Sequence, residues 1–152
     1  MTFEESRKLA QALDRGRAAI MEAAGRGEIT ANDVSRLRRE IFANGLITRD
    51  EADALFWLEA STTVQSPCWT AFLVEAITDH VVWQSRPTGV VNEAQGEWLI
   101  ARADEAASLN GLAVLVNVMA EAHRVPLWFL AAVRARATRD WAGVAEARAL
   151  VA

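Results

Sequence analysis

The chain has 152 residues, of which 52% are hydrophobic and 24% charged, and its net charge is −4. This composition is typical of a globular protein and excludes a globally disordered one. No segment approaches the ~20 consecutive apolar residues of a membrane-spanning helix, and the N-terminus lacks the apolar core of a secretory signal. The single cysteine, Cys68, excludes an intrachain disulfide and a multi-cysteine zinc site. We therefore expect a cytoplasmic protein without a membrane span.

Charge is unevenly distributed along the chain. Residues 41–123 contain three basic and eleven acidic side chains, a net charge of −8, whereas residues 124–152 have a net charge of +3 and residues 1–40 of +1. An acidic middle argues against a nucleic-acid surface there. We expect the basic ends to pack against the acidic centre, either within one fold or across a dimer.

Helical signals predominate in the first half of the chain, and strand signals are nearly absent. Each expected helix begins at a Thr, Ser or Asn that can cap it, or ends at a glycine. A first helix is predicted over residues 3–24, a second from Thr30 to Ala43, a third from Thr48, and a fourth from Ser66-Pro67 to about Gln84. The fourth is apolar on most sides, which is typical of a central, buried helix.

The second half continues the same pattern. Asn92 is expected to cap a fifth helix, Asn110-Gly111 to form a turn before a sixth over 112–123, Val125-Pro126 to open a seventh, and Thr138 to cap a last one. The sequence predicts an all-α compact bundle of seven or eight helices around the helix at about 67–84. We expect one domain over 1–152, with an N-terminal helix (1–24), a repeat-containing core (25–137) and a C-terminal helix (138–152).

One phrase occurs three times: glycine, any residue, an apolar residue, then a capping residue before a helix. It reads Gly27-Glu28-Ile29-Thr30, Gly45-Leu46-Ile47-Thr48 and Gly89-Val90-Val91-Asn92. With the glycine at position 6 of a calcium loop, the other ligand positions include arginine or phenylalanine in every copy, whereas calcium needs about six to eight oxygens. The second copy alone keeps several oxygen donors, from Glu40, Asn44 and Glu51. The phrase is therefore expected to be architectural.

The segment Ile41–Leu55, with its Asn44-Gly45-Leu46-Ile47 turn and Glu51, resembles the glycine-isoleucine-glutamate phrase of TerB-like (tellurite-resistance-associated) helical bacterial proteins. The run Phe72–Asp79 is similar to a stretch of small proteins of the same type, and the resemblance extends from Ile29 to about Pro126. It implies an all-α fold with degenerate EF-hand-like repeats, and acidic residues proposed to bind a metal. The positions concerned are Glu40, Asn44, Asp50 and Glu51.

Other polar residues give a weaker signal. Glu75 and Asp79 share one face of the apolar fourth helix, where they could form an acid/base or metal pair, a surface stripe, or ion pairs with Arg86 or Arg134. His80 on the same helix is expected to be a core residue with satisfied hydrogen bonds. Cys68, near the start of that helix, is too far from His80 to act with it.

The second histidine, His123, is expected at a helix end, where a cationic side chain is favourable. We find no motif that assembles a catalytic group, and we expect no enzyme activity and no cofactor. The sequence favours a non-enzymatic helical protein-interaction or regulatory module with a protein partner or a homodimer. The alternative is a TerB-like, divalent-metal-linked stress-response protein, and an enzyme centred on Glu75 and Asp79 ranks last.

Overall fold

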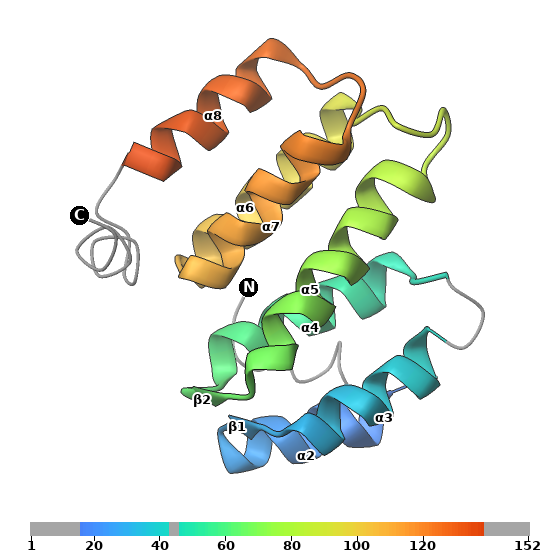
Figure 1. Ribbon diagram of the computed structural model, residues 1–152, viewed down its shortest axis with the longest axis vertical. Helices are drawn as coiled ribbons and strands as arrows, with labels where there is room; N and C mark the ends of the chain where they lie inside the picture. The colour runs from blue at the N-terminus through green and yellow to red at the C-terminus, as the bar shows by residue number, and fades with distance from the viewer. Residues whose placement is uncertain (1–15, 43–45, 139–152) are drawn as a thin grey trace. The chain divides into compact units, whose positions relative to one another are not determined.

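The computed structural model describes residues 16–42 and 46–138, and this part of the chain is all-α (Figure 1). It contains seven α-helices, a π-helical turn and two short strands. The helices are α2 (Arg17–Arg26), α3 (Ala31–Ile41), α4 (Arg49–Ser61), α5 (Pro67–Thr78), α6 (Glu93–Ala106), α7 (Leu109–Glu121) and α8 (Leu127–Thr138). The π-helical turn η1 spans Asp79–Trp83, and the strands are β1 (Glu28–Ile29) and β2 (Val64–Gln65). The predicted fold class is confirmed.

Among the described residues, no helix has both the length and the apolar character that are needed to cross a membrane. The predicted first helix falls partly on residues 1–15, outside the described residues, and α2 ends at Gly27, which has a left-handed φ of 70°. Thr138 is the last described residue of α8, and its hydroxyl donates to the Ala135 carbonyl at 3.0 Å. The C-terminal helix predicted beyond it lies outside the described residues.

The chain divides into two compact units, residues 1–80 and 81–152, called unit 1 and unit 2 here. The single-domain organisation expected from the sequence stays a prediction. In unit 1, α2 packs against α3 and α4, and α5 packs against α3 and α4. Its core is formed by fully buried aliphatic and aromatic side chains from all four helices, including Ile20, Leu37, Ile41, Leu55, Leu58, Trp69, Phe72, Leu73 and Ile77.

Helix α5 starts as predicted at Pro67, whose fixed φ suits the first helical position. Ser66 precedes it but makes no side-chain capping bond, and its hydroxyl lies 3.2 Å from the Cys68 sulfur instead. The helix is not buried all round, because Cys68 and Glu75 are exposed on one side. The helical path then continues through the π-helical turn to Trp83, within one residue of the predicted end.

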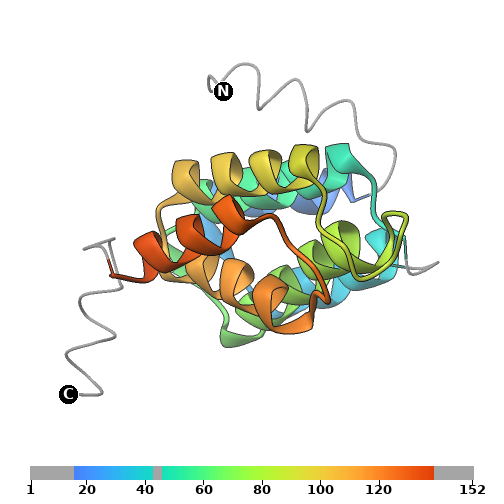
Figure 2. The ribbon, with the colours of Figure 1, turned by 90° about the horizontal axis from the view of Figure 1, so that it is seen from above.

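In unit 2, α6 packs against α7 and α7 packs against α8 (Figure 2). The core of this unit consists of Val81, Val82, Val91, Leu99, Ala103, Val114, Leu115, Val118, Phe129 and Val133. The turn predicted at Asn110-Gly111 is wrong, because α7 already begins at Leu109. Ser108 caps it by accepting the Gly111 N–H at 3.1 Å, and a serine cap sets the start of a helix more strongly than an interior Asn-Gly pair.

Candidate functional site

The first copy of the repeated phrase builds a helix start with two reciprocal hydrogen bonds. The Thr30 hydroxyl accepts the Asp33 N–H at 3.2 Å, and the Asp33 carboxylate accepts the Thr30 N–H at 2.8 Å. Arg26, at the end of α2, also donates to Asp33 and forms an ion pair with it. Burial alone would raise the pKa of Asp33, but the hydrogen bonds from Thr30 and Arg26 outweigh it and lower that pKa. The Asp33 carboxylate therefore stabilises the start of α3.

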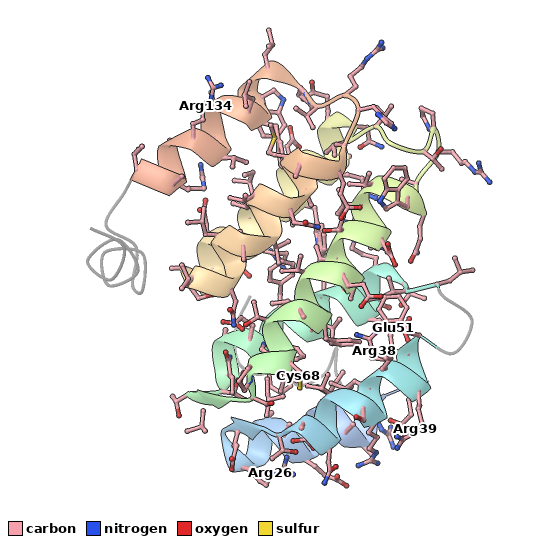
Figure 3. The ribbon with its side chains drawn as sticks, viewed as in Figure 1. Arg26, Arg38, Arg39, Glu51, Cys68 and Arg134 are labelled. Carbon is pink, nitrogen blue, oxygen red and sulfur yellow. The ribbon has the colours of Figure 1, made fainter. Side chains whose placement is uncertain are left out.

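The second copy has the same construction. Thr48 accepts the Glu51 N–H at 3.1 Å, and the Glu51 carboxylate accepts the Thr48 N–H at 2.8 Å. Glu51 is buried, with 3% of its surface exposed (Figure 3). In such a capping box the carboxylate satisfies an N–H that would otherwise lack a partner. One of its oxygens is thereby committed to the start of α4.

The four positions that the TerB-like alternative would use to bind a metal have different surroundings. Glu40 lies near the end of α3, where one of its oxygens is 3.4 Å from the Arg36 Nε. Asp50 is exposed, Glu51 caps α4, and Asn44 lies outside the described residues. Within residues 16–42 and 46–138, no three acidic, histidine or cysteine side chains gather closely enough to hold a metal ion.

The third copy caps α6, since Asn92 accepts the Gln95 N–H at 2.8 Å. Its glycine, Gly89, has a left-handed φ of 80°, matching Gly27 in the first copy. The apolar residue of each phrase is buried in the core, at Ile29, Ile47 and Val91. In all three copies the phrase buries one apolar side chain and caps the next helix, and in the first and third copies the glycine turns the chain, as the architectural interpretation predicts.

The first and third copies share a further feature that the sequence did not reveal. The Gly27 carbonyl accepts the N–H groups of Thr63 and Val64, at 3.0 and 3.4 Å, and β1 pairs with β2 in parallel. In unit 2 the Gly89 carbonyl accepts the N–H groups of His123 and Arg124, at 2.7 and 3.2 Å.

Val90 and Arg124 also form a parallel bridge, so each of the two units contains a short parallel backbone pairing. In each unit a short parallel pairing sets the starts of two helices beside each other: α3 and α5 in unit 1, α6 and α8 in unit 2. Parallel pairing between residues far apart in sequence depends on tertiary contacts, and two-residue strands carry no periodic signal.

Glu75 and Asp79 do not form a buried carboxylate pair. Glu75 is about half exposed and makes an ion pair with Arg38 of α3 at 2.9 Å. The Arg38 guanidinium also lies over the Phe72 ring, 5.4 Å from its centre. The ion pair of Glu75 is thus with Arg38 and not with Arg86 or Arg134, the two arginines suggested by the sequence, because α3 packs directly on α5. Asp79 begins the π-helical turn and is partly buried.

His80 is a buried residue with both ring nitrogens engaged, as predicted. Its Nδ1 lies 3.1 Å from the Ile47 carbonyl, so Nδ1 donates, and its Nε2 can accept from the Arg49 Nε at 3.4 Å. Burial lowers the pKa of His80, and the positive charge of Arg49 adds to this, against the opposing effects of the Ile47 carbonyl and Asp53. The neutral ring therefore connects the start of α4 to the end of α5.

A buried polar group that sequence reasoning missed lies between α4 and α5. The Glu59 carboxylate accepts the indole N–H of Trp69 at 2.8 Å and the side-chain amide of Gln65 at 3.1 Å. Both Glu59 and Trp69 are buried. Trp69 is a core residue, and the Glu59 carboxylate satisfies its only polar side-chain atom.

Trp83 and Trp128, by contrast, have more than a third of their surface exposed. Trp83 is edge-on to the exposed His123 ring and donates to Glu121 at 2.8 Å. Trp128 donates to Glu93 at 2.6 Å and lies across Gly96, where an added Cβ would be 3.0 Å from the ring. Each indole thus pairs its N–H with a surface carboxylate and leaves part of its ring accessible to a partner.

These observations define an all-α protein whose repeated polar motifs hold helix ends. Comparison with protein-family models, with curated proteins and with solved structures finds no match. The resemblance to TerB-like proteins therefore stays a prediction.

Proposed function

We propose that this protein is a non-enzymatic helical interaction or regulatory module that associates with a second copy of itself. The observation that carries the proposal is the apolar surface at the start of α8. Leu127 is 85% exposed and is followed by Trp128, which is 37% exposed. Adjacent large apolar side chains on a surface mark sites of association more often than scattered single ones do, and tryptophan is frequent among residues that dominate binding energy.

The arrangement of the polar candidates supports the same proposal. Asp33 and Glu51 stabilise helix starts, Glu75 pairs with Arg38 at the surface, and His80 connects two elements of unit 1. Each of these groups has a structural task in the fold. Exposed apolar side chains, by contrast, gain free energy when a partner removes them from water.

Size-exclusion chromatography with light scattering on the full chain tests the proposal. We expect a mass of twice the 16.6 kDa of one chain at micromolar concentration. A strictly monomeric chain at every concentration up to the millimolar range would contradict self-association.

The metal-linked alternative has one observation in its favour. Glu40 has a side-chain oxygen that is buried without a hydrogen-bond partner among the described residues, and a buried carboxylate oxygen favours a cation. Under this alternative, calcium raises the melting temperature of the protein, and Glu40→Gln abolishes the shift. Under the interaction proposal, calcium leaves the melting temperature unchanged in both proteins.

A further inference from the structure

Helix α8 is apolar in composition but buries little of its surface. Of its twelve residues, Phe129 and Val133 alone are fully buried. Leu127, Ala131, Arg134 and Thr138 are all exposed, and their spacing of four, three and four places them on one side of the helix. We call these four residues the α8 face. Helix α8 packs on α7 and contacts α6 through Trp128 and Arg136, and the α8 face lies on the side of the helix away from these contacts (Figure 2).

The α8 face combines an apolar start with a positive charge. Residues 124–138 contain three arginines and no acidic residue. Arg136 donates two hydrogen bonds to Asp104 of the same unit, at 2.7 and 2.6 Å. Arg134 is exposed (Figure 3), and its guanidinium makes no ion pair or hydrogen bond with the residues that the structure describes. A partner surface that fits this face is apolar with a carboxylate nearby.

A surface of that kind exists on α6 of the same unit. Glu97, Ala101 and Glu105 are exposed and spaced by four residues, so they form one stripe, which we call the α6 face. Glu105 pairs with Arg102 of its own helix at 2.8 Å. Glu97 has no ion pair or hydrogen bond within the described part of the chain. The α6 face is therefore negative, with a small apolar centre.

The complementary faces belong to one unit of one chain, which is necessary for a symmetric dimer but does not by itself select one. When a twofold axis relates two copies, the contact between the α8 face and the α6 face forms twice and closes a dimer, whereas another operator would give a ring or a filament; we commit to the twofold arrangement. The contact between Arg136 and Asp104 shows that α8 and α6 already pair basic with acidic groups inside the unit.

We propose that the α8 face of one copy docks on the α6 face of a second copy, and reciprocally. Arg134 then pairs with Glu97 of the other copy, and Leu127 covers the apolar centre at Ala101. This inference rests on the proposed function, because it names the surface through which the module associates.

Sedimentation equilibrium of the full chain over a range of concentrations tests the surface. Leu127→Glu should weaken dimerisation by roughly tenfold or more, because it replaces an apolar contact by a charge opposite other carboxylates. Arg134→Glu should weaken it by a similar factor, and the double variant Arg134→Glu/Glu97→Arg should recover most of the loss. Circular dichroism establishes that each variant keeps the helical fold.

Two substitutions in unit 1 provide matched controls. Val64 is 57% exposed, and Arg39 is exposed on α3 without an ion pair among the described residues (Figure 3). Val64→Glu and Arg39→Glu introduce the same charges at surfaces outside the two faces and should leave the dimer constant unchanged.

The outcomes separate this inference from the function on which it rests. A dimer that is weakened equally by the controls, or is unaffected by Leu127→Glu and Arg134→Glu, would overturn the α8 surface while self-association stands. A chain that stays monomeric at all concentrations would overturn both. If Arg134→Glu weakens the dimer and the added substitution Glu97→Arg does not restore its affinity, the assignment of Glu97 as the partner of Arg134 would be refuted.

Discussion

Replacing three glycines by alanine, one at a time, distinguishes the cost of a left-handed backbone from the cost of a steric clash. Gly25 lies in α2 with no atom within 4 Å of an added Cβ. Gly27 has the same open surroundings but a left-handed φ of 70°. Gly89 has a left-handed φ of 80°, and an added Cβ there would lie 2.4 Å from Cδ2 of His123 and 3.3 Å from Cγ of the same ring.

The free energies expected for alanine at these positions follow from that geometry. Gly25→Ala should stabilise the protein by about 0.5–1 kcal/mol, since alanine favours a helix over glycine. Gly27→Ala should destabilise it by about 1–2 kcal/mol, the cost of a left-handed conformation for a residue with a Cβ.

Gly89→Ala adds a steric effect to this conformational cost. An added Cβ would contact both Cδ2 and Cγ of the His123 ring, so the ring must move. It would then lose its edge-on contact with Trp83, in which the two ring centres are 6.0 Å apart. Such a contact contributes about 0.5–1.5 kcal/mol, which brings the expected destabilisation to about 2–3 kcal/mol.

Urea denaturation followed by circular dichroism measures all three differences. The order of stability should be Gly25→Ala, wild type, Gly27→Ala, then Gly89→Ala. If Gly89→Ala were no less stable than Gly27→Ala, the close approach of His123 to the chain at Gly89 would be refuted.

Two further predictions concern buried polar groups of unit 1. Asp33→Ala should destabilise the protein by about 1 kcal/mol in urea denaturation, because it removes the reciprocal cap of Thr30; a loss below 0.3 kcal/mol, on the order of error in such measurements, would speak against the cap. His80 has a pKa lowered by burial, so its neutral form stabilises the fold fully above its ordinary pKa of about 6.5, and this contribution is lost as pH falls below that value. The melting temperature should therefore drop on acidification from pH 7 to 5, and drop less in His80→Gln; an equal drop in both proteins would exclude His80 as the cause.

The parts of the fold that depend on local chemistry could be predicted from the sequence. Thr30, Thr48 and Asn92 each begin a helix, because the side chain of each accepts the backbone N–H of the residue three positions further on. Pro67 opens α5 for an equally local reason, its fixed φ. Where two local signals competed, as at Ser108 and the Asn-Gly pair after it, the prediction failed.

Contacts between distant residues could not be predicted. Glu75 meets Arg38 because α3 packs on α5, and no spacing in the sequence encodes that packing. Glu59 meets Trp69 across the junction of α4 and α5 in the same way. The exposure of Leu127 could not be predicted either, because an apolar helix start is typical of both a core helix and a docking surface.

The central claim is that the protein associates with itself and does so without a metal ion. Native mass spectrometry on the full chain, purified without chelator and then measured again after addition of calcium, tests this most directly. The account predicts a homodimer with the mass of two bare chains in both conditions. A monomer, or a dimer that retains an ion or forms with calcium alone, would contradict it.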